Sequence, residues 1–179
     1  MKKIISLAIM VFFTMMSFAQ TSLTPTDAGS KVHFVIKNFG INTGGDLSDL
    51  KGVIKYDRNK PLTLSIDVTV NVNTIDTDNE RRDKHLKSDD YFDAEKFPLI
   101  RLLSTKIETT TSTGNLLFTG MLTIKDVTKN IQFPFTITPK DGGYLFMGNF
   151  TIDRQVYGVG GNSATMGDNV DISISVFAK

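Results

Sequence analysis

Residues 79–98 read NERRDKHLKSDDYFDAEKFP and differ from the rest of the chain. They are dense in charged residues and helix formers and end at a proline, whereas the residues on either side alternate between apolar and polar side chains. Three segments with this alternation precede the stretch and five follow it. We therefore predict a β-structure that is capped at one end by a short helical segment, at about residues 79–93.

A helix is expected over residues 80–87 because the sequence suits both of its ends. Asp78 or Asn79 can accept a hydrogen bond from the first turn. Glu80 lies near the positive end of the helix dipole and Lys87 near the negative end, where each charge is stabilising. This segment concentrates the polar chemistry of the chain.

Eight segments show the alternation typical of half-buried strands. Residues 64–72 show it most clearly and are rich in β-branched residues, which suit a pleated sheet. Turn sequences such as Lys125-Asp126 and Asp141-Gly142-Gly143 join neighbouring segments as hairpins. The pattern predicts an all-β fold, an antiparallel barrel or sandwich, with strands at residues 32–36, 50–56, 64–72, 99–108, 116–124, 131–137, 144–152 and 170–176.

Four regions are less regular. Residues 21–30 are polar and are expected to be a lead-in, and residues 40–45 are expected to be a turn. Residues 99–108 have apolar side chains on both parities, which indicates a β-bulge or burial on both faces. Pro134 has no N–H for a ladder, so its strand is expected to lie at an edge or to bulge there.

The first nineteen residues have the pattern of a secretory signal peptide. A lysine pair precedes the apolar residues 4–18, and Ser17 and Ala19 supply the small residues of a cleavage site. The apolar run is about 15 residues, shorter than the roughly 20 of a membrane span, which favours cleavage over an uncleaved anchor. We expect cleavage after Ala19, a single domain at residues 20–179, and a periplasmic or secreted protein.

Charge and cysteine content exclude several kinds of partner. The whole chain has a net charge of +1, and removal of Lys2 and Lys3 makes it −1. A near-neutral chain has no field that attracts nucleic acid, and no second apolar run could insert stably into a membrane. The absence of cysteine excludes disulfides, a lipidated N-terminal cysteine and thiolate metal ligands. The sequence leaves the oligomeric state open.

Strand parity predicts which side chains face the interior. An eight-stranded barrel is either just filled by its side chains or holds one small ligand, and parity leaves both alternatives open. The residues expected to line the lumen are Phe34, Ile36, Ile54, Ile66, Val68, Phe118, Leu122, Phe133, Phe135, Phe146, Phe150, Ile172 and Ile174.

Several motifs resemble those of one family. They are Arg82-Asp83-Lys84-His85-Leu86 with Asp90-Tyr91-Phe92-Asp93, then Gly120-Met121-Leu122-Thr123-Ile124 with Val127-Thr128-Lys129, and Ile152-Asp153-Arg154 with Tyr157-Gly158. They are similar to motifs of the YceI-like family, lipocalin-like proteins described as polyisoprenoid-binding, along nearly all of residues 20–179. The resemblance implies an exported, eight-stranded, antiparallel lipocalin-like barrel whose lumen takes an isoprenoid- or quinone-type lipid.

Five residues near the helical segment and the last long loop are candidates for a rim, head-group contact or gate: Arg82, His85, Tyr91, Phe92 and Arg154. We expect Arg82, Asp83 and His85 to form a polar network that ties the helix to the rim, with Arg82 or His85 facing a head group. For Arg154 an ion pair with Asp153 or Asp168 is favoured over a ligand contact. Tyr91 and Phe92, with Phe97, are expected to plug or gate one end.

Catalysis is not expected. The chain has two histidines, lacks the Gly-x-Ser-x-Gly motif of a nucleophile elbow, and shows no spacing that supplies the three or four ligands of a metal site. We expect no catalytic residue, no metal and no cofactor. The function expected is a lipid carrier or sequestering protein. The alternatives are a filled barrel that acts through its surface in stress response or adhesion, and an enzyme that modifies a lipid or quinone.

Overall fold

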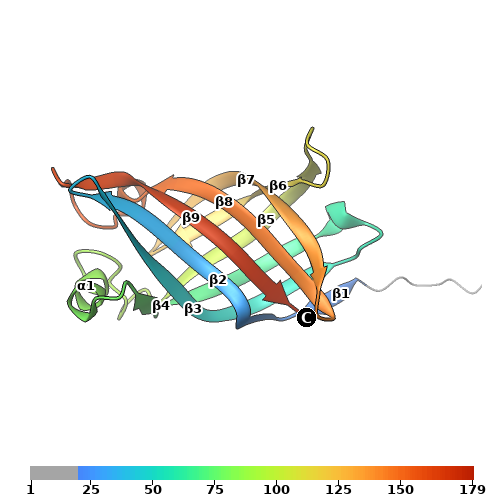
Figure 1. Ribbon diagram of the computed structural model, residues 1–179, viewed down its shortest axis with the longest axis horizontal. Helices are drawn as coiled ribbons and strands as arrows, with labels where there is room; N and C mark the ends of the chain where they lie inside the picture. The colour runs from blue at the N-terminus through green and yellow to red at the C-terminus, as the bar shows by residue number, and fades with distance from the viewer. Residues whose placement is uncertain (1–19) are drawn as a thin grey trace, which may run out of the picture.

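The computed structural model describes residues 20–179, which form a closed antiparallel β-barrel (Figure 1). Each barrel strand pairs with its neighbour in sequence, and β9 returns to pair with β2, so the barrel has eight strands as predicted. The predicted signal peptide, residues 1–19, lies outside the described residues. The strands are β1 (Thr21–Leu23), β2 (Pro25–Asn38), β3 (Ile41–Tyr56), β4 (Ser65–Asp76), β5 (Leu99–Thr109), β6 (Leu116–Ile124), β7 (Val127–Lys140), β8 (Gly143–Asp153) and β9 (Met166–Ala178).

One α-helix covers one end of the barrel, as Figure 1 shows. Helix α1 (Glu80–Leu86) begins where the side chain of Asn79 accepts a hydrogen bond from the N–H of Arg82, at 3.0 Å. It ends at Leu86, one residue earlier than expected, and Lys87 is its C-cap residue. Two 3₁₀ helices, η1 (Pro61–Thr63) and η2 (Gln155–Tyr157), lie in the connections after β3 and β8.

The lead-in expected at residues 21–30 is instead part of the sheet. The short strand β1 pairs with the end of β3, and Pro25 and Thr26 of β2 pair with Ala178 and Phe177 of β9. The ladder is then interrupted until Lys31. Pairing with β3 and β9 provides hydrogen-bond partners for the backbone N–H and C=O groups of the paired residues. Their polar side chains can therefore face solvent without an alternating pattern.

The turn expected at residues 40–45 is also shorter than the sequence indicates. Only Phe39 and Gly40 form it, and β3 begins at Ile41. Gly45 is a close-packing position within the strand, since a Cβ there would lie 2.6 Å from Cγ2 of Thr77 and 2.8 Å from the carbonyl oxygen of Asp76. A glycine can mark a close backbone approach as well as a turn.

A β-bulge explains the mixed parity of residues 99–108. The register of β5 against β6 shifts between Ser104 and Lys106, so Ile100 and Leu102 point inward before the shift and Ile107 after it. Pro134 lies opposite Leu117 of β6, while the β7–β8 ladder begins only at the next residue. Its missing N–H therefore costs no pairing with β8.

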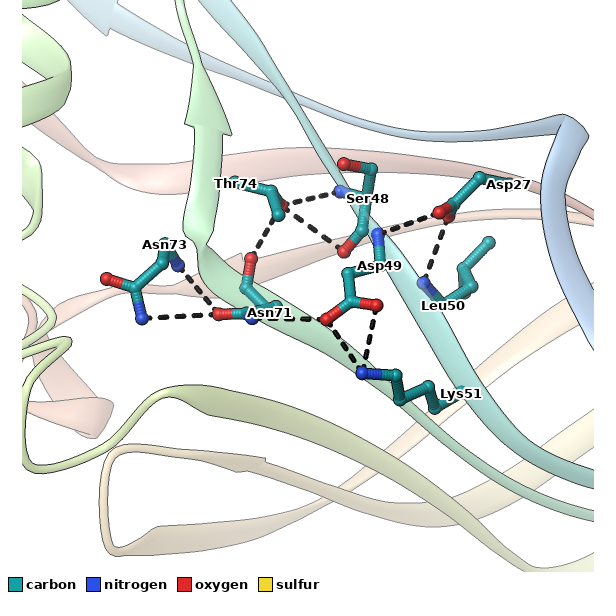
Figure 2. A network of polar contacts seen from close by, with 8 residues as sticks. All are labelled: Asp27, Ser48, Asp49, Leu50, Lys51, Asn71, Asn73 and Thr74. Carbon is teal, nitrogen blue, oxygen red and sulfur yellow. Dashed lines mark hydrogen bonds and ion pairs between the residues drawn. The ribbon is translucent and has the colours of Figure 1, made fainter.

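A polar network fixes a second irregularity, between β3 and β4 (Figure 2). The carboxylate of Asp27, from β2, accepts hydrogen bonds from the N–H groups of Asp49 and Leu50, at 3.1 and 3.0 Å. Asp49 has a left-handed backbone (φ +57°). Hydrogen bonds from Lys51 and Asn71 hold the pKa of the Asp49 carboxyl below its usual value. The network fixes the course of β3 where its register against β4 shifts.

The half of the barrel away from α1 is packed with aromatic rings. Phe133 stacks on Phe118 and on Phe150, with ring centroids 4.7 and 4.5 Å apart. Tyr56 meets Tyr144 edge-on at 4.8 Å, and burial raises the pKa of Tyr56. These rings close the far end of the interior.

We predict that Asp27→Asn lowers the free energy of unfolding by about 1–2 kcal/mol. The amide offers one acceptor oxygen where the carboxylate offers two, so one of the N–H groups of Asp49 and Leu50 loses its partner. Urea denaturation measures the effect. Glu95→Gln, which also exchanges a carboxylate for an amide at an exposed site, serves as the control and should leave stability within about 0.5 kcal/mol. An equal loss in both variants would contradict the role given to Asp27.

Candidate functional site

An apolar cavity of about 130 Å³ lies inside the barrel beneath α1. A second cavity of about 100 Å³ shares the walls made by Phe34, Leu47 and Ile100 and so continues the first toward the middle of the barrel. A third, of about 30 Å³, shares Val68 and Leu102 with the second and lies among the aromatic rings. Together they mark an apolar path that begins at the α1 end and narrows inward.

All thirteen residues expected in the lumen line one of these cavities. The strands alternate regularly along most of their length, which is why parity placed them inside. Their role in ligand binding stays a prediction. Phe34, Ile36 and Ile172 line the first cavity; Val68, Leu122, Phe150 and Ile174 line the second; Ile54, Ile66, Phe118, Phe133, Phe135 and Phe146 line the third.

The interior is hollow at one end and filled by side chains at the other, so it combines the two alternatives that parity left open. Near α1 it is hollow, whereas beyond Phe150 the stacked rings of Phe133 and Phe118 leave little space. A ligand that enters from the α1 end therefore meets a closed far end. The mouth of the first cavity is set by α1, the β2–β3 hairpin and the segment from Arg154 to Met166.

Thr77, a buried residue after β4, ties α1 to the barrel. The carboxylate of Asp83 accepts from the N–H of Thr77 at 3.0 Å and from its hydroxyl. Arg82 Nε donates to the Thr77 hydroxyl oxygen at 2.8 Å, and Nη2 donates to its carbonyl oxygen. Arg82 and Thr77 both line the first cavity. A guanidinium is thereby held at the mouth by a residue of the barrel itself.

His85 does not belong to this network, contrary to the expectation. It is exposed, packs edge-on against Tyr91 with ring centroids 4.8 Å apart, and does not line the cavity. The helix turn directs Leu86 toward the cavity instead. Leu86 follows Arg82 by four residues and so lies on the same helix face, a signal that the sequence contained.

Arg154 is almost completely buried, with 3% of its surface exposed. Its guanidinium donates to the carbonyl oxygens of Gly167 and Val159, each at 2.9 Å, and pairs with Asp168 at 3.0 Å. Asp153 instead accepts from the N–H of Gln155. Arg154 thus holds the last long loop, and its fork is occupied by protein acceptors even though it lines the cavity.

Tyr91 and Phe92 are partly buried and line the mouth. Phe97 does not line it, and its ring lies 4.8 Å from Lys96 Nζ. Tyr157 backs the wall through contacts with the apolar cluster that includes Ile124 and Ile152, and burial raises its pKa. Val159, in the loop after η2, and Met166, the first residue of β9, also line the cavity; the sequence around both has no alternating pattern, so sequence analysis missed them.

The described residues contain no cluster of three or more metal-ligating side chains within reach of one ion. Within residues 20–179, moreover, no helix combines the length and the apolar character needed to cross a bilayer. The lining of the first cavity is apolar apart from Asn38, Thr43, Thr77 and two guanidiniums, those of Arg82 and the internally bonded Arg154.

Comparison with known proteins identifies the family. A profile described as YceI-like domain matches residues 23–178. The chain belongs to the YceI-like family. This YceI-like domain is similar to a UPF0312 protein of Pseudomonas aeruginosa, with 28% identity over 152 residues, 81% of this chain and 78% of that protein.

Two solved structures share the YceI-like barrel. BcnA of Burkholderia cenocepacia superposes with a TM-score of 0.79 at 26% identity, covering 85% of this chain and 98% of that one. A polyisoprenoid-binding domain of Saccharophagus degradans superposes with a TM-score of 0.67 at 11% identity, covering 89% and 98%. The second likeness shows a common fold.

Proposed function

We propose that this protein is an exported, non-catalytic binding protein that holds a long apolar lipid, of isoprenoid or quinone type, in its barrel. The observation that carries the proposal is the apolar path from the mouth at Arg82 to the aromatic stack at Phe133. The fold shared with a polyisoprenoid-binding domain of another organism supports the ligand class. The signal-peptide pattern of residues 1–19 supports a periplasmic or secreted location, with cleavage after Ala19.

The size of the cavities sets what fits without rearrangement. The first cavity, about 130 Å³, is close to the roughly 150 Å³ that suffices to bind benzene in an apolar protein interior. It takes a segment of about one isoprene unit, five carbons. A longer chain must also occupy the second cavity, which requires the partly buried side chains of the shared wall, such as Ile100 and Ile172, to shift.

The energetics favour a chain of several units. Burial contributes roughly 0.8 kcal/mol per CH₂-sized group, so one isoprene unit contributes about 4 kcal/mol. Association costs an estimated 4–15 kcal/mol. One unit therefore barely offsets the lower end of that range, whereas four units exceed the upper end. Affinity should depend steeply on chain length until the path is full.

We predict that farnesol and geranylgeraniol bind more tightly than geraniol, by about tenfold or more per added unit until a plateau. Ile172 lies in the wall shared by the two cavities, so Ile172→Trp should fill the space between them. It should lower the affinity for geranylgeraniol by about tenfold or more. Titration calorimetry or competition with a fluorescent probe measures both effects.

The matched control is Ser173→Trp, which places the same ring on the exposed face of the same strand. It should bind as the unaltered protein does. No saturable binding of any of the three alcohols to the unaltered protein would overturn the proposed function. Equal affinity in all variants would show that the ligand lies outside the barrel.

Arg82 is the group at the mouth that fits a polar head group. Two of its nitrogens are bound to Thr77, whereas Nη1 makes no hydrogen bond within the described part of the chain. A guanidinium suits a phosphate or carbonyl oxygen. Because the far end is closed by Phe118 and Phe133, the head group remains at the mouth and the chain extends inward.

We predict that Arg82→Gln removes a preference for farnesyl phosphate over farnesol. A hydrogen bond between charged groups contributes about 1.5–3 kcal/mol, so the preference should fall by roughly tenfold or more, while farnesol affinity changes little. Arg81→Gln, at the exposed neighbouring residue, should retain the preference. Urea denaturation of both variants separates a loss of recognition from a loss of folding. If Arg82→Gln kept the full preference while folded, Arg82 would not contact the head group.

A further inference from the structure

Two adjacent segments at the mouth carry no charged residue. Residues 38–45 and residues 159–167 contain no Asp, Glu, Lys or Arg, in a chain that is 22% charged. The segments lie side by side, since Asn38 pairs with Met166 and the N–H of Phe39 donates to the carbonyl oxygen of Thr165 at 2.8 Å. We call them together the uncharged rim. Residues 80–90 adjoin the rim at Gly160, whose N–H donates to the carbonyl oxygen of Asp90 at 3.0 Å, and differ from it, because eight of these eleven residues are charged.

The uncharged rim ends in two exposed apolar side chains. Phe39 is 75% exposed and Ile41 70%, the highest values among the large hydrophobic residues that the structure describes. Phe39 also has a left-handed backbone (φ +51°), a conformation in which glycine or asparagine is more usual. Neither the turn nor the core accounts for a phenylalanine here. Its exposed ring is available for a contact outside the chain.

The tip of the β2–β3 hairpin, which carries Phe39 and Ile41, is joined to the cavity mouth by a continuous ladder. The β2–β3 ladder runs without interruption from Val32 opposite Leu47 to Asn38 opposite Ile41. Ile36 and Thr43, a few residues below the tip, line the first cavity. Figure 1 shows this hairpin at the same end of the barrel as α1. Whatever the tip contacts is therefore brought next to the opening.

We propose that the uncharged rim docks reversibly on the head-group region of an electrically neutral lipid bilayer, with Phe39 and Ile41 inserted at the boundary of the acyl chains. This inference rests on the proposed function for its purpose, because docking would place the cavity mouth against the source of the lipid. Apolar side chains on a polar body bind the bilayer interface in this way.

A bilayer fits the rim better than a second protein does. A stable protein interface buries about 800 Å² on each partner, whereas one aromatic side chain contributes about 150–250 Å². Phe39 and Ile41 stand on a narrow hairpin whose flanking residues 42–45 are asparagine, threonine and two glycines. These small residues add little area and no charges for a protein partner. A bilayer needs only the apolar tip, and the nearest charged side chain on the hairpin, Lys37, lies opposite Asn42 below that tip.

The chain contains no tryptophan, so one introduced tryptophan reports directly on the tip. Phe39→Trp should show fluorescence that shifts to shorter wavelength and resists quenching by iodide when phosphatidylcholine vesicles are added. The matched control is Leu62→Trp, at a residue 49% exposed on η1 at the opposite end of the barrel. It should show neither effect. No shift for Phe39→Trp, or an equal shift in both variants, would overturn the proposal.

A second variant separates docking from lipid binding. Phe39→Ser with Ile41→Ser should lose about tenfold or more of vesicle binding in co-sedimentation, yet bind geranylgeraniol in solution as the unaltered protein does. If the unaltered protein docks but binds no isoprenoid, the proposed function fails and the docking surface stands. If it binds isoprenoid but does not sediment with vesicles, the docking surface fails alone. A shift of Phe39→Trp that follows protein concentration without vesicles would indicate self-association and overturn it.

Discussion

The pairing of β2 with β9 is the constraint on which the rest of the structure depends. It joins the first long strand to the last and, together with the β3–β4 pairing, closes the sheet on itself. Closure removes free sheet edges and divides every strand into an inner and an outer face. The apolar residues of one parity then share a single interior. Without closure, the same side chains would form an open apolar face.

Closure alone does not decide whether that interior is hollow. At the far end the large rings of Phe118, Phe133 and Phe146 occupy the space. Near α1 the aromatic rings Phe34, Tyr91 and Phe92 share the walls with smaller side chains such as Ile36, Ile124 and Ile172, and space remains between them. The resulting gradient gives the barrel one mouth and one closed end. Thr77 holds α1 over that mouth, and Arg154 holds the loop that adjoins it. An asymmetric container of this kind orients a ligand that has one polar end.

The sequence predicted the barrel and its inner face because the two-residue period of a strand needs no knowledge of distant contacts. It failed where a contact decides the conformation. The sequence places Gly45 in a turn, but in the structure it lies within β3, where that strand approaches Thr77. His85 and Leu86 are neighbours in sequence, and only the docking of the helix decides which of them faces the cavity.

The free volume and the mouth could not be predicted from sequence for the same reason. Volume depends on how rings from several strands stack, and the β5 bulge reverses the parity within one strand. The position of Val159 and Met166 at the cavity depends on the buried Arg154, whose partners lie up to fourteen residues away. Such positions carry no periodic pattern.

The most direct test of the account is native mass spectrometry, with organic extraction, of the protein purified from its own host. An exported lipid-binding barrel should begin at Gln20 and carry a stoichiometric apolar lipid of isoprenoid or quinone type. The extract would give the chain length and the head group. A ligand-free protein whose extract contains no such lipid would contradict the account and would favour a barrel that acts through its surface.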